Sequence, residues 1–259
     1  MKEYLKMYVF LIKSFFRVKR QQRIDFIIGM IGSLMFYLPS IVFVTLLGVN
    51  NWSMGNVSAN DLVFLQGIFI LVCCPMNIVC DNLWNLKTDL IEGGYIRYYF
   101  KPGNSLFFYL SETINVKALP ELFVGIYLVY SGLENYHFNW VSLSSFILVL
   151  LVSTLTPISI RTISAATGFW IVNSHGTILF SNNIMGYGKY PFSIFVKQLS
   201  LGSALLIPIL FIAYIPFKVL TSKYTIVLLI LCSFFNILLL KASLLIWKKG
   251  DERSSSTGS

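Results

Sequence analysis

The sequence predicts an all-α integral membrane protein with six transmembrane helices, and its composition and its apolar runs are the two observations that predict it. Of the 259 residues, 56% are hydrophobic and only 12% are charged, whereas about a quarter of the residues in a soluble domain are charged. A helical span needs about 20 apolar residues. The apolar runs therefore provide six spans with short loops, and we predict that residues 1–259 form a single transmembrane domain.

A basic, amphipathic stretch at residues 1–23 precedes the first apolar run. It contains seven cations, and the apolar residues between them are three and four positions apart. That period places the apolar side chains on one face of a helix, so that cations on the other face can reach lipid phosphates. We predict an elbow helix on the cytoplasmic surface of the membrane. A calmodulin target or a mitochondrial presequence has a similar pattern, but a span seldom follows either of them at once.

The distribution of cations predicts the orientation of the spans. The loops at 50–61 and 132–142 have no Lys or Arg, whereas cations precede the first span and Lys248-Lys249 follows the last. The positive-inside rule then predicts cytoplasmic N- and C-termini, and the net charge of +9 indicates anionic lipid rather than nucleic acid as its partner. Two lysines at 218–223 fall on the outer side, but the bias at the N-terminus outweighs them. The expected spans cover about residues 24–49, 62–80, 106–133, 141–170, 199–217 and 224–247.

Four charged residues fall within the third and fourth of these spans. Glu112, Lys117 and Glu121 lie in the third span, and Arg161 lies toward the cytoplasmic end of the fourth. A charge at the bilayer centre costs about 2.5 kcal/mol or more. Lys117 and Glu121 are four residues apart, so they could pair on one helix face. Two interpretations stay open: the four side chains line a polar transport path, or they reach out to the cytoplasmic edge of the membrane.

The stretch at 87–110, between the second and third spans, contains two expected breaks. Gly93-Gly94 interrupts a helix, and Pro102-Gly103 forces a turn because proline cannot continue a helix. Asn104 or Ser105 can cap the helix that follows. We expect a short helix over 83–92, a break, a basic and aromatic cluster at the membrane interface, and re-entry into the membrane. Composition alone is equally consistent with an ordinary basic loop.

Two motifs resemble those of one family. The stretch from Gly94 to Phe107 (GYIRYYFKPGNSLF) is similar to the family's "G-x-x-x-x-x-L-x-[RK]-P-x-[ND]-x-L-F". The stretch from Lys189 to Phe195 (KYPFSIF) is similar to "[RK]-Y-P-[LF]-x-I-[YF]", which leads into the family's fifth span. Pro208 and Tyr214-Ile215-Pro216 match its "P…YxP" pattern, and the C-terminal tail resembles its "Y-x-[SG]-[AT]-G-S" ending without the tyrosine. The family is the six-span permeases of type-2 ABC exporters, specifically the small paired drug- and polysaccharide-export permeases without an ATPase domain.

This resemblance implies a permease subunit that forms half of an export path in the bacterial cytoplasmic membrane. Its expected partners are an ABC ATPase dimer, which would bind the ATP, and either a second permease of the family or a second copy of this chain. It also implies a cytoplasmic coupling loop at 81–105 that contains a coupling helix. The residues expected to contact the ATPase are Leu83, Leu86, Lys87, Asp89, Leu90 and Glu92. The interfacial motif that follows consists of Arg97, Lys101 and Pro102.

Other classes of function have less support. The sequence has no G-x-x-x-x-G-K-[ST] motif, its four cysteines lie in apolar runs, and His137 and His175 lie in separate loops. We therefore expect no metal, no cofactor and no catalysis by the chain itself. A membrane-embedded lipid transferase would have only Glu112, Glu121 and Arg161 to use. The alternatives are an ion-coupled secondary transporter, which needs ionisable groups near mid-membrane, and a membrane-embedded immunity or anchor protein.

Overall fold

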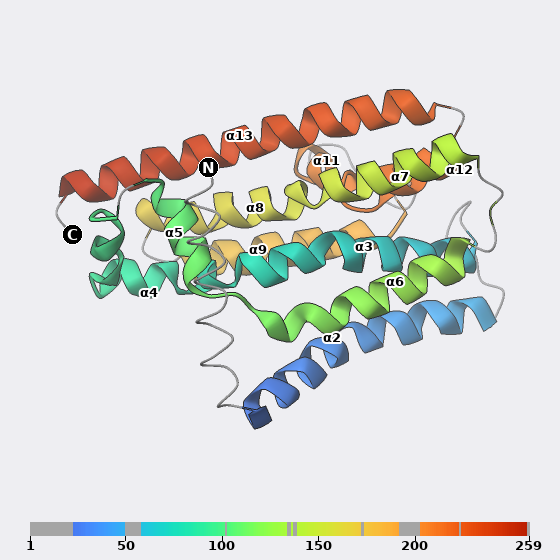
Figure 1. The fold of residues 1–259 in the computed structure, drawn as a ribbon, viewed down its shortest axis with the longest axis horizontal. Coiled ribbons are helices and arrows are strands. Elements are labelled where there is room, and N and C mark those ends of the chain that lie inside the picture. The colour runs from blue at the N-terminus through green and yellow to red at the C-terminus, as the bar shows by residue number, and fades with distance from the viewer. Residues whose placement is uncertain are drawn as a thin grey trace.

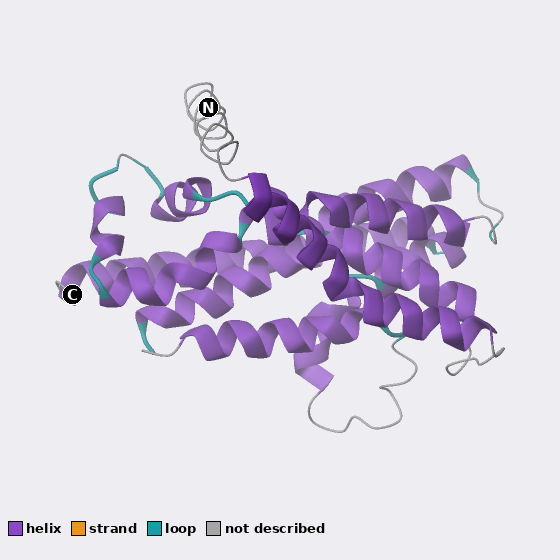
Figure 2. Ribbon diagram, turned by 90° about the horizontal axis from the view of Figure 1, so that it is seen from below, coloured by secondary structure: helices purple, strands orange, loops and turns teal. Residues whose placement is uncertain are grey.

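The computed structural model describes residues 23–49, 58–101, 103–133, 136, 139–171, 174–191, 203–222 and 224–257 (Figure 1). Within these ranges every regular element is a helix and no strand occurs, which confirms the all-α prediction for this part of the chain (Figure 2). The elbow helix expected at 1–23 falls, except for Arg23, outside the described residues, as does Pro102.

Among the described residues, five helical stretches are long and apolar enough to cross a membrane, whereas the sequence predicts six. They are Ile24–Phe43, Asn60–Val79, Val116–Leu133, Trp140–Phe169 and Thr225–Ser254. Figure 1 shows most of them running along the long axis of the molecule, with the first inclined beneath the third. The helices that supply them are α2 (Arg23–Val49), α3 (Ala59–Val79), α6 (Leu119–Leu133), α7 (Trp140–Ser153) with α8 (Leu155–Ala166), and α13 (Thr225–Thr257).

Helix α3 lies at the centre of the bundle, in contact with α2, α6, α7 and α8. Helix α6 approaches it closely because glycines of both helices face side chains of the opposite helix. A Cβ atom on Gly67 would lie 2.8 Å from the Leu128 Cβ, and one on Gly125 would lie 2.8 Å from the Leu71 side chain. Small residues at such contacts let transmembrane helices associate by van der Waals packing.

The route expected for the fifth span is segmented. Instead of one helix over 199–217, the described residues form α11 (Ser203–Leu210) and α12 (Tyr214–Thr221) with a turn between them. Pro208 disrupts the backbone hydrogen bonding of α11, and Pro216 lies in the first turn of α12, where a proline is tolerated. Helix α9 (Ser174–Met185) packs along α8 and contains His175, which we expected to lie in a loop. The described residues between α8 and α13 therefore form short helices.

Two further boundaries differ from the expected ones. The range 106–133 is divided into α5 (Ser105–Glu112), the 3₁₀ turn η3 (Val116–Ala118) and α6, which begins beside Pro120. Helix α13 continues to Thr257, past the expected end at 247. Both differences matter for the site, because they change which charged residues meet.

Candidate functional site

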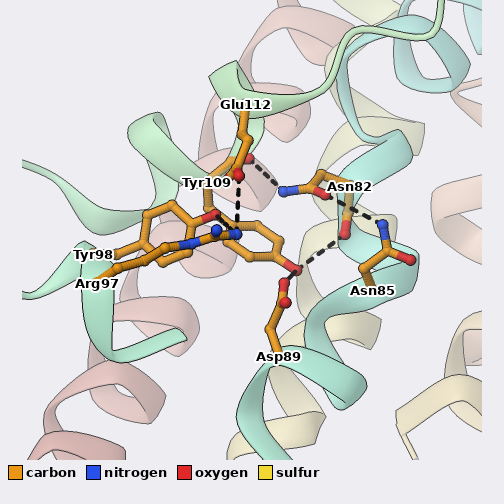
Figure 3. A network of polar contacts seen from close by, with 7 residues as sticks. All are labelled: Asn82, Asn85, Asp89, Arg97, Tyr98, Tyr109 and Glu112. Atoms are coloured by element: carbon orange, nitrogen blue, oxygen red, sulfur yellow. Dashed lines mark hydrogen bonds and ion pairs between the residues drawn. The ribbon is translucent and has the colours of Figure 1, made fainter. Parts of the chain in front are cut away.

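The segment between α3 and α6, residues 81–112 without Pro102, closes one end of the bundle. It contains η1 (Asp81–Asn85), α4 (Leu86–Ile91), η2 (Gly94–Tyr98) and α5. Helix α4 ends at the expected break because Gly93 adopts a φ of 75°, a left-handed conformation that glycine accepts without strain. Asn104 caps α5, its side-chain oxygen accepting a hydrogen bond of 2.9 Å from the Leu106 N–H. These breaks fold the 81–112 segment back on itself, so that its polar side chains meet (Figure 3).

Tyr109 is the centre of this polar network. Its buried hydroxyl lies 2.7 Å from the Asp89 carboxylate and 3.1 Å from the Asn82 carbonyl oxygen, and the Asn82 side chain donates to the Tyr109 carbonyl at 2.8 Å (Figure 3). Burial, and then the hydrogen bond to Asp89, raise the pKa of Tyr109 well above its usual range. The phenol therefore stays protonated and holds η1, α4 and α5 together.

Arg97 and Glu112 form an ion pair of 2.9 Å at the edge of the network, and Arg97 also donates to the Tyr98 hydroxyl at 3.0 Å (Figure 3). Burial raises the pKa of Glu112, and the charge of Arg97 opposes that shift. Lys101 lies over the Tyr98 ring, 4.8 Å from its centroid. Glu112, which we considered as lining a transport path, is thus engaged at the end of the bundle.

Helix α13 is tied to this end through Asp251. The Asp251 carboxylate accepts hydrogen bonds from the Tyr95 hydroxyl at 2.8 Å and from the Ser105 hydroxyl at 2.7 Å. Trp247, one turn earlier on α13, donates to the Ser105 hydroxyl at 3.3 Å and packs edge-on against Phe169. Burial is the main cause that raises the pKa of Tyr95. Asp251 was missed from the sequence because we ended the last span at the Lys248-Lys249 pair that precedes it.

The residues expected to contact an ATPase are not all at the surface. Leu83 and Leu86 are 0% exposed, Lys87, Asp89 and Leu90 are half-buried, and Glu92 is exposed. The expectation that Leu83 and Leu86 contact an ATPase at the surface is therefore corrected, because both side chains are buried. It assumed one α-helix over 83–92, whereas residues 81–85 form a 3₁₀ turn, which has three residues per turn and presents different faces. The large apolar side chains that do face outward are Ile91 (63% exposed), Ile96 (42%) and Phe100 (83%).

The charges of the third span have partners other than the expected ones. The buried Glu121 accepts hydrogen bonds from the Asn77 side chain at 2.9 Å and the Tyr37 hydroxyl at 3.1 Å. Lys117 pairs with Asp25 of α2 at 2.8 Å. The Lys117–Glu121 pair that the spacing suggested does not form, because Lys117 belongs to η3 and α6 begins only at Leu119.

A cavity of about 520 Å³ lies between α2, α3, α8 and α9 and reaches the surface at Phe36 and Tyr187. Arg161 of α8 lines it and is only 4% exposed. Its guanidinium carbon lies 5.0 Å from the centroid of the Trp84 ring, and that ring lies 5.0 Å from the His175 ring. The full lining consists of Phe36, Tyr37, Phe69, Cys73, Met76, Asn77, Arg161, Asn182, Asn183, Met185, Gly186, Tyr187, Lys189 and Tyr190.

The structure thus separates most of the predicted site residues into two groups, and Lys117, paired with Asp25, lies outside both. The expected coupling residues, Arg97, Lys101 and Glu112 lie at the closed end, whereas Arg161 lies at the cavity and Glu121 behind two of its lining residues. Trp84, Tyr37 and Asn77 were missed as site residues. The sequence offers only weak signals for them, because Trp84 and Tyr37 are two of many aromatic residues and Asn77 is an amide in an apolar run. Within the described ranges, no cluster of His, Cys, Asp or Glu could hold a metal ion.

Comparison with known proteins agrees with the resemblance seen in the sequence. Residues 27–258 match the family described as "ABC-2 family transporter protein". Neither the curated proteins nor the solved structures gave a match. The family match covers nearly the whole chain and includes all five long apolar helices but for the first residues of the first one. The chain therefore belongs to the ABC-2 family of transporter proteins, and it is a multi-pass membrane protein.

Proposed function

We propose that the chain is the permease subunit of an ATP-binding-cassette exporter, coupled to ATPase subunits on separate chains. The observation that carries this proposal is the construction of the 81–112 segment. Its inner face is bonded to α13 through Asp251, while its outer face exposes Ile91, Ile96 and Phe100 beside Glu92. Such a surface suits a partner protein, because exposed apolar anchors surrounded by charges are typical of interfaces. A displacement applied there would pass into the bundle.

The orientation that we propose puts this end in the cytoplasm of a bacterial cell. Six cations belong to the 81–112 segment and to the last turns of α13, both at the same end of the bundle in Figure 1. The positive-inside rule favours the cytoplasmic side for such a group. The cations are Lys87, Arg97, Lys101, Lys248, Lys249 and Arg253.

The proposed export path is the cavity between α2, α3, α8 and α9. One chain leaves it open at a surface that includes the exposed residues Phe36, Asn183 and Tyr187. Asn183 would meet lipid there in a lone chain, which is unfavourable for an amide. A second permease, either a related chain or another copy, would cover this side and complete the path.

The coupling proposal is tested by co-expressing the chain with P-loop ABC ATPases from the same genome. We expect a detergent-resistant complex, and no ATP hydrolysis by the chain alone. Replacing Ile91 and Phe100 together by Ala should weaken the complex by about 2 kcal/mol or more, because exposed apolar anchors carry much of an interface's energy. Complex yield on a sizing column and transport-linked ATPase activity in vesicles are the measurements.

The matched control is the double change Phe123→Ala and Ile126→Ala. These side chains are 75% and 56% exposed but lie on α6, within a span. The control should leave the complex intact. Equal complex yield from both double variants, or hydrolysis by the chain alone, would contradict the proposal.

A second candidate function is ion-coupled transport, and Glu121 is the observation that favours it. A carboxylate buried within a span and hydrogen-bonded to Tyr37 and Asn77 is the kind of group that proton-driven transporters use. Vesicles containing the chain alone, with a pH gradient and no ATP, separate the two candidates. Transport under that gradient that is lost in Glu121→Gln would favour ion coupling over the ATPase.

A further inference from the structure

Arg161 occupies an unusual electrostatic position. It lies on α8, inside the Trp140–Phe169 span, and is only 4% exposed. Arginine stays charged in proteins, and a charge taken out of water is unfavourable unless a counter-charge or hydrogen bonds replace the water. The surroundings of Arg161 therefore indicate what the site is built to hold.

No carboxylate of the described residues forms an ion pair with Arg161. Glu121 is engaged by Tyr37 and Asn77. Asp81, whose charge reaches Arg161, accepts a hydrogen bond from Asn115 at 3.3 Å and lines a different cavity. Other described cations do have carboxylate partners: Arg97 pairs with Glu112, Lys117 with Asp25 and Lys248 with Glu252.

The guanidinium group is nevertheless fixed in position. The Trp84 ring covers one face of the guanidinium at 5.0 Å, a favourable cation–π contact. Its buried Nε has no acceptor among the described residues. The Trp84 ring contacts only the flat face of the guanidinium group. The N–H donors along the edge of that group can therefore bind a ligand in the cavity that Arg161 lines.

The rest of the cavity adds to this chemistry. Lys189 brings a second cation, and the buried Asn182 side-chain oxygen also lacks a donor within the described ranges. Phe36, Phe69 and Met76 line the same space with apolar surface. The volume of 520 Å³ is within the range of about 300–1,000 Å³ found for small-molecule sites.

We propose that this cavity binds an amphipathic anion, with Arg161 and Lys189 holding a phosphate or carboxylate group and the aromatic wall holding the apolar part. The inference deepens the proposed function, because it assigns the class of cargo that the permease would export. Arginine bonds either acid group through two parallel N–H donors, which suits the free edge of Arg161. Asn182 would bond a hydroxyl or amide group of the same ligand.

The test measures binding to the purified full-length chain in a neutral detergent. Dodecyl phosphate is the probe, and the readout is the rise in melting temperature with its concentration. Three comparison ligands each change one property of the probe. Dodecanoate replaces the phosphate by a carboxylate, dodecyltrimethylammonium reverses the sign of the charge, and inorganic phosphate lacks the apolar chain. We expect saturable stabilisation by the two amphipathic anions, and none by the cation or by inorganic phosphate alone.

The variants are Arg161→Gln, Arg161→Lys and Lys189→Gln. Arg161→Gln should weaken the apparent affinity for dodecyl phosphate by about tenfold or more, which is about 1.4 kcal/mol. Arg161→Lys should recover part of it, and Lys189→Gln should cause a smaller loss that remains measurable if Arg161→Gln fails to fold. Lys248→Gln is the matched control, because Lys248 is exposed on α13 away from the cavity, and it should bind like the parent.

Each outcome decides one of the two proposals. Unchanged affinity in Arg161→Gln, or equal stabilisation by the cationic amphiphile, would overturn the anion site. Equal binding of inorganic phosphate would overturn its amphipathic character. Complex formation with the ATPase is measured on the same variants and should survive in Arg161→Gln. A parent that binds the ATPase but no anion refutes only this inference, whereas one that binds the anion but no ATPase refutes only the proposed function.

Discussion

Asp251→Ala is the change that most directly tests how the 81–112 segment is joined to the bundle. The Asp251 carboxylate accepts the hydroxyl protons of Tyr95 at 2.8 Å and of Ser105 at 2.7 Å. Tyr95 is 1% exposed and Ser105 8%, so water would replace the lost acceptor poorly for both. Trp247 is affected as well, because its indole N–H donates to the Ser105 hydroxyl at 3.3 Å.

The magnitude follows from these contacts. A hydrogen bond to a charged group contributes about 1.5–3 kcal/mol, and Asp251 accepts two from side chains. Asp251 itself is half-buried, so some water can enter the space left by the carboxylate. We therefore expect the free energy of unfolding to fall by about 2–4 kcal/mol. This is less than the sum for two fully buried bonds, because water partly replaces the carboxylate.

The assay is equilibrium unfolding in mixed micelles, followed by tryptophan fluorescence and helicity. Glu252→Ala is the matched control, because it removes a carboxylate from the next residue, which is 65% exposed and lies 3.8 Å from Lys248. Exposed pairs of this kind contribute about 0–1 kcal/mol. If Asp251→Ala loses no more stability than Glu252→Ala, the Asp251 bonds do not hold the segment, and the reasoning about coupling through α13 fails with them.

Two further predictions concern the same end of the bundle. Leu86→Ala should lower the free energy of unfolding by about 2–5 kcal/mol, because it empties space in the core, whereas the exposed Ile91→Ala should leave stability nearly unchanged; equal losses in unfolding titrations would contradict the burial of Leu86. Burial raises the pKa values of Tyr95 and Tyr109 above the value of about 10 that tyrosine has in an unfolded chain. The unfolded chain then loses these protons first, so the stability that the two phenols provide is complete below about pH 10 and decreases as the pH rises above it. Unfolding titrations between neutral and strongly alkaline pH check this, and the decrease should be smaller in Tyr95→Phe.

The sequence was sufficient for features that depend on composition or on one residue's backbone preference. Five long apolar helices follow from hydropathy, and the end of α4 follows from the freedom of Gly93 to adopt positive φ. The segmented fifth crossing is less visible, because Pro208 and Pro216 lie in an apolar run whose average hydropathy hides them. A mean hydropathy over a window of residues shows how well the segment suits a lipid environment. It does not show whether the helix is continuous.

The candidate site needed the structure for a different reason. The predicted contact of Leu83 and Leu86 with an ATPase requires both to face outward, but a helix pattern alone does not say which side of a loop faces the rest of the protein. Similarly, the i, i+4 spacing of Lys117 and Glu121 predicts a pair only if one helix contains both residues. Long-range bonds such as Tyr95–Asp251, 156 positions apart, leave no local signal in one sequence.

Trp84 connects the two parts of the candidate site and offers a physical route between them. It lies in η1 beside the fully buried Leu83, so η1 cannot move independently of the core. Its ring contacts both Arg161 at the cavity and His175 at the start of α9, each at 5.0 Å. Because close-packed interiors transmit displacement instead of absorbing it, a shift of the 81–112 segment would change the position of Arg161 and of α9 together. Arg161 and α9 both line the cavity. A displacement of the closed end would therefore move the groups that we propose to bind the anion.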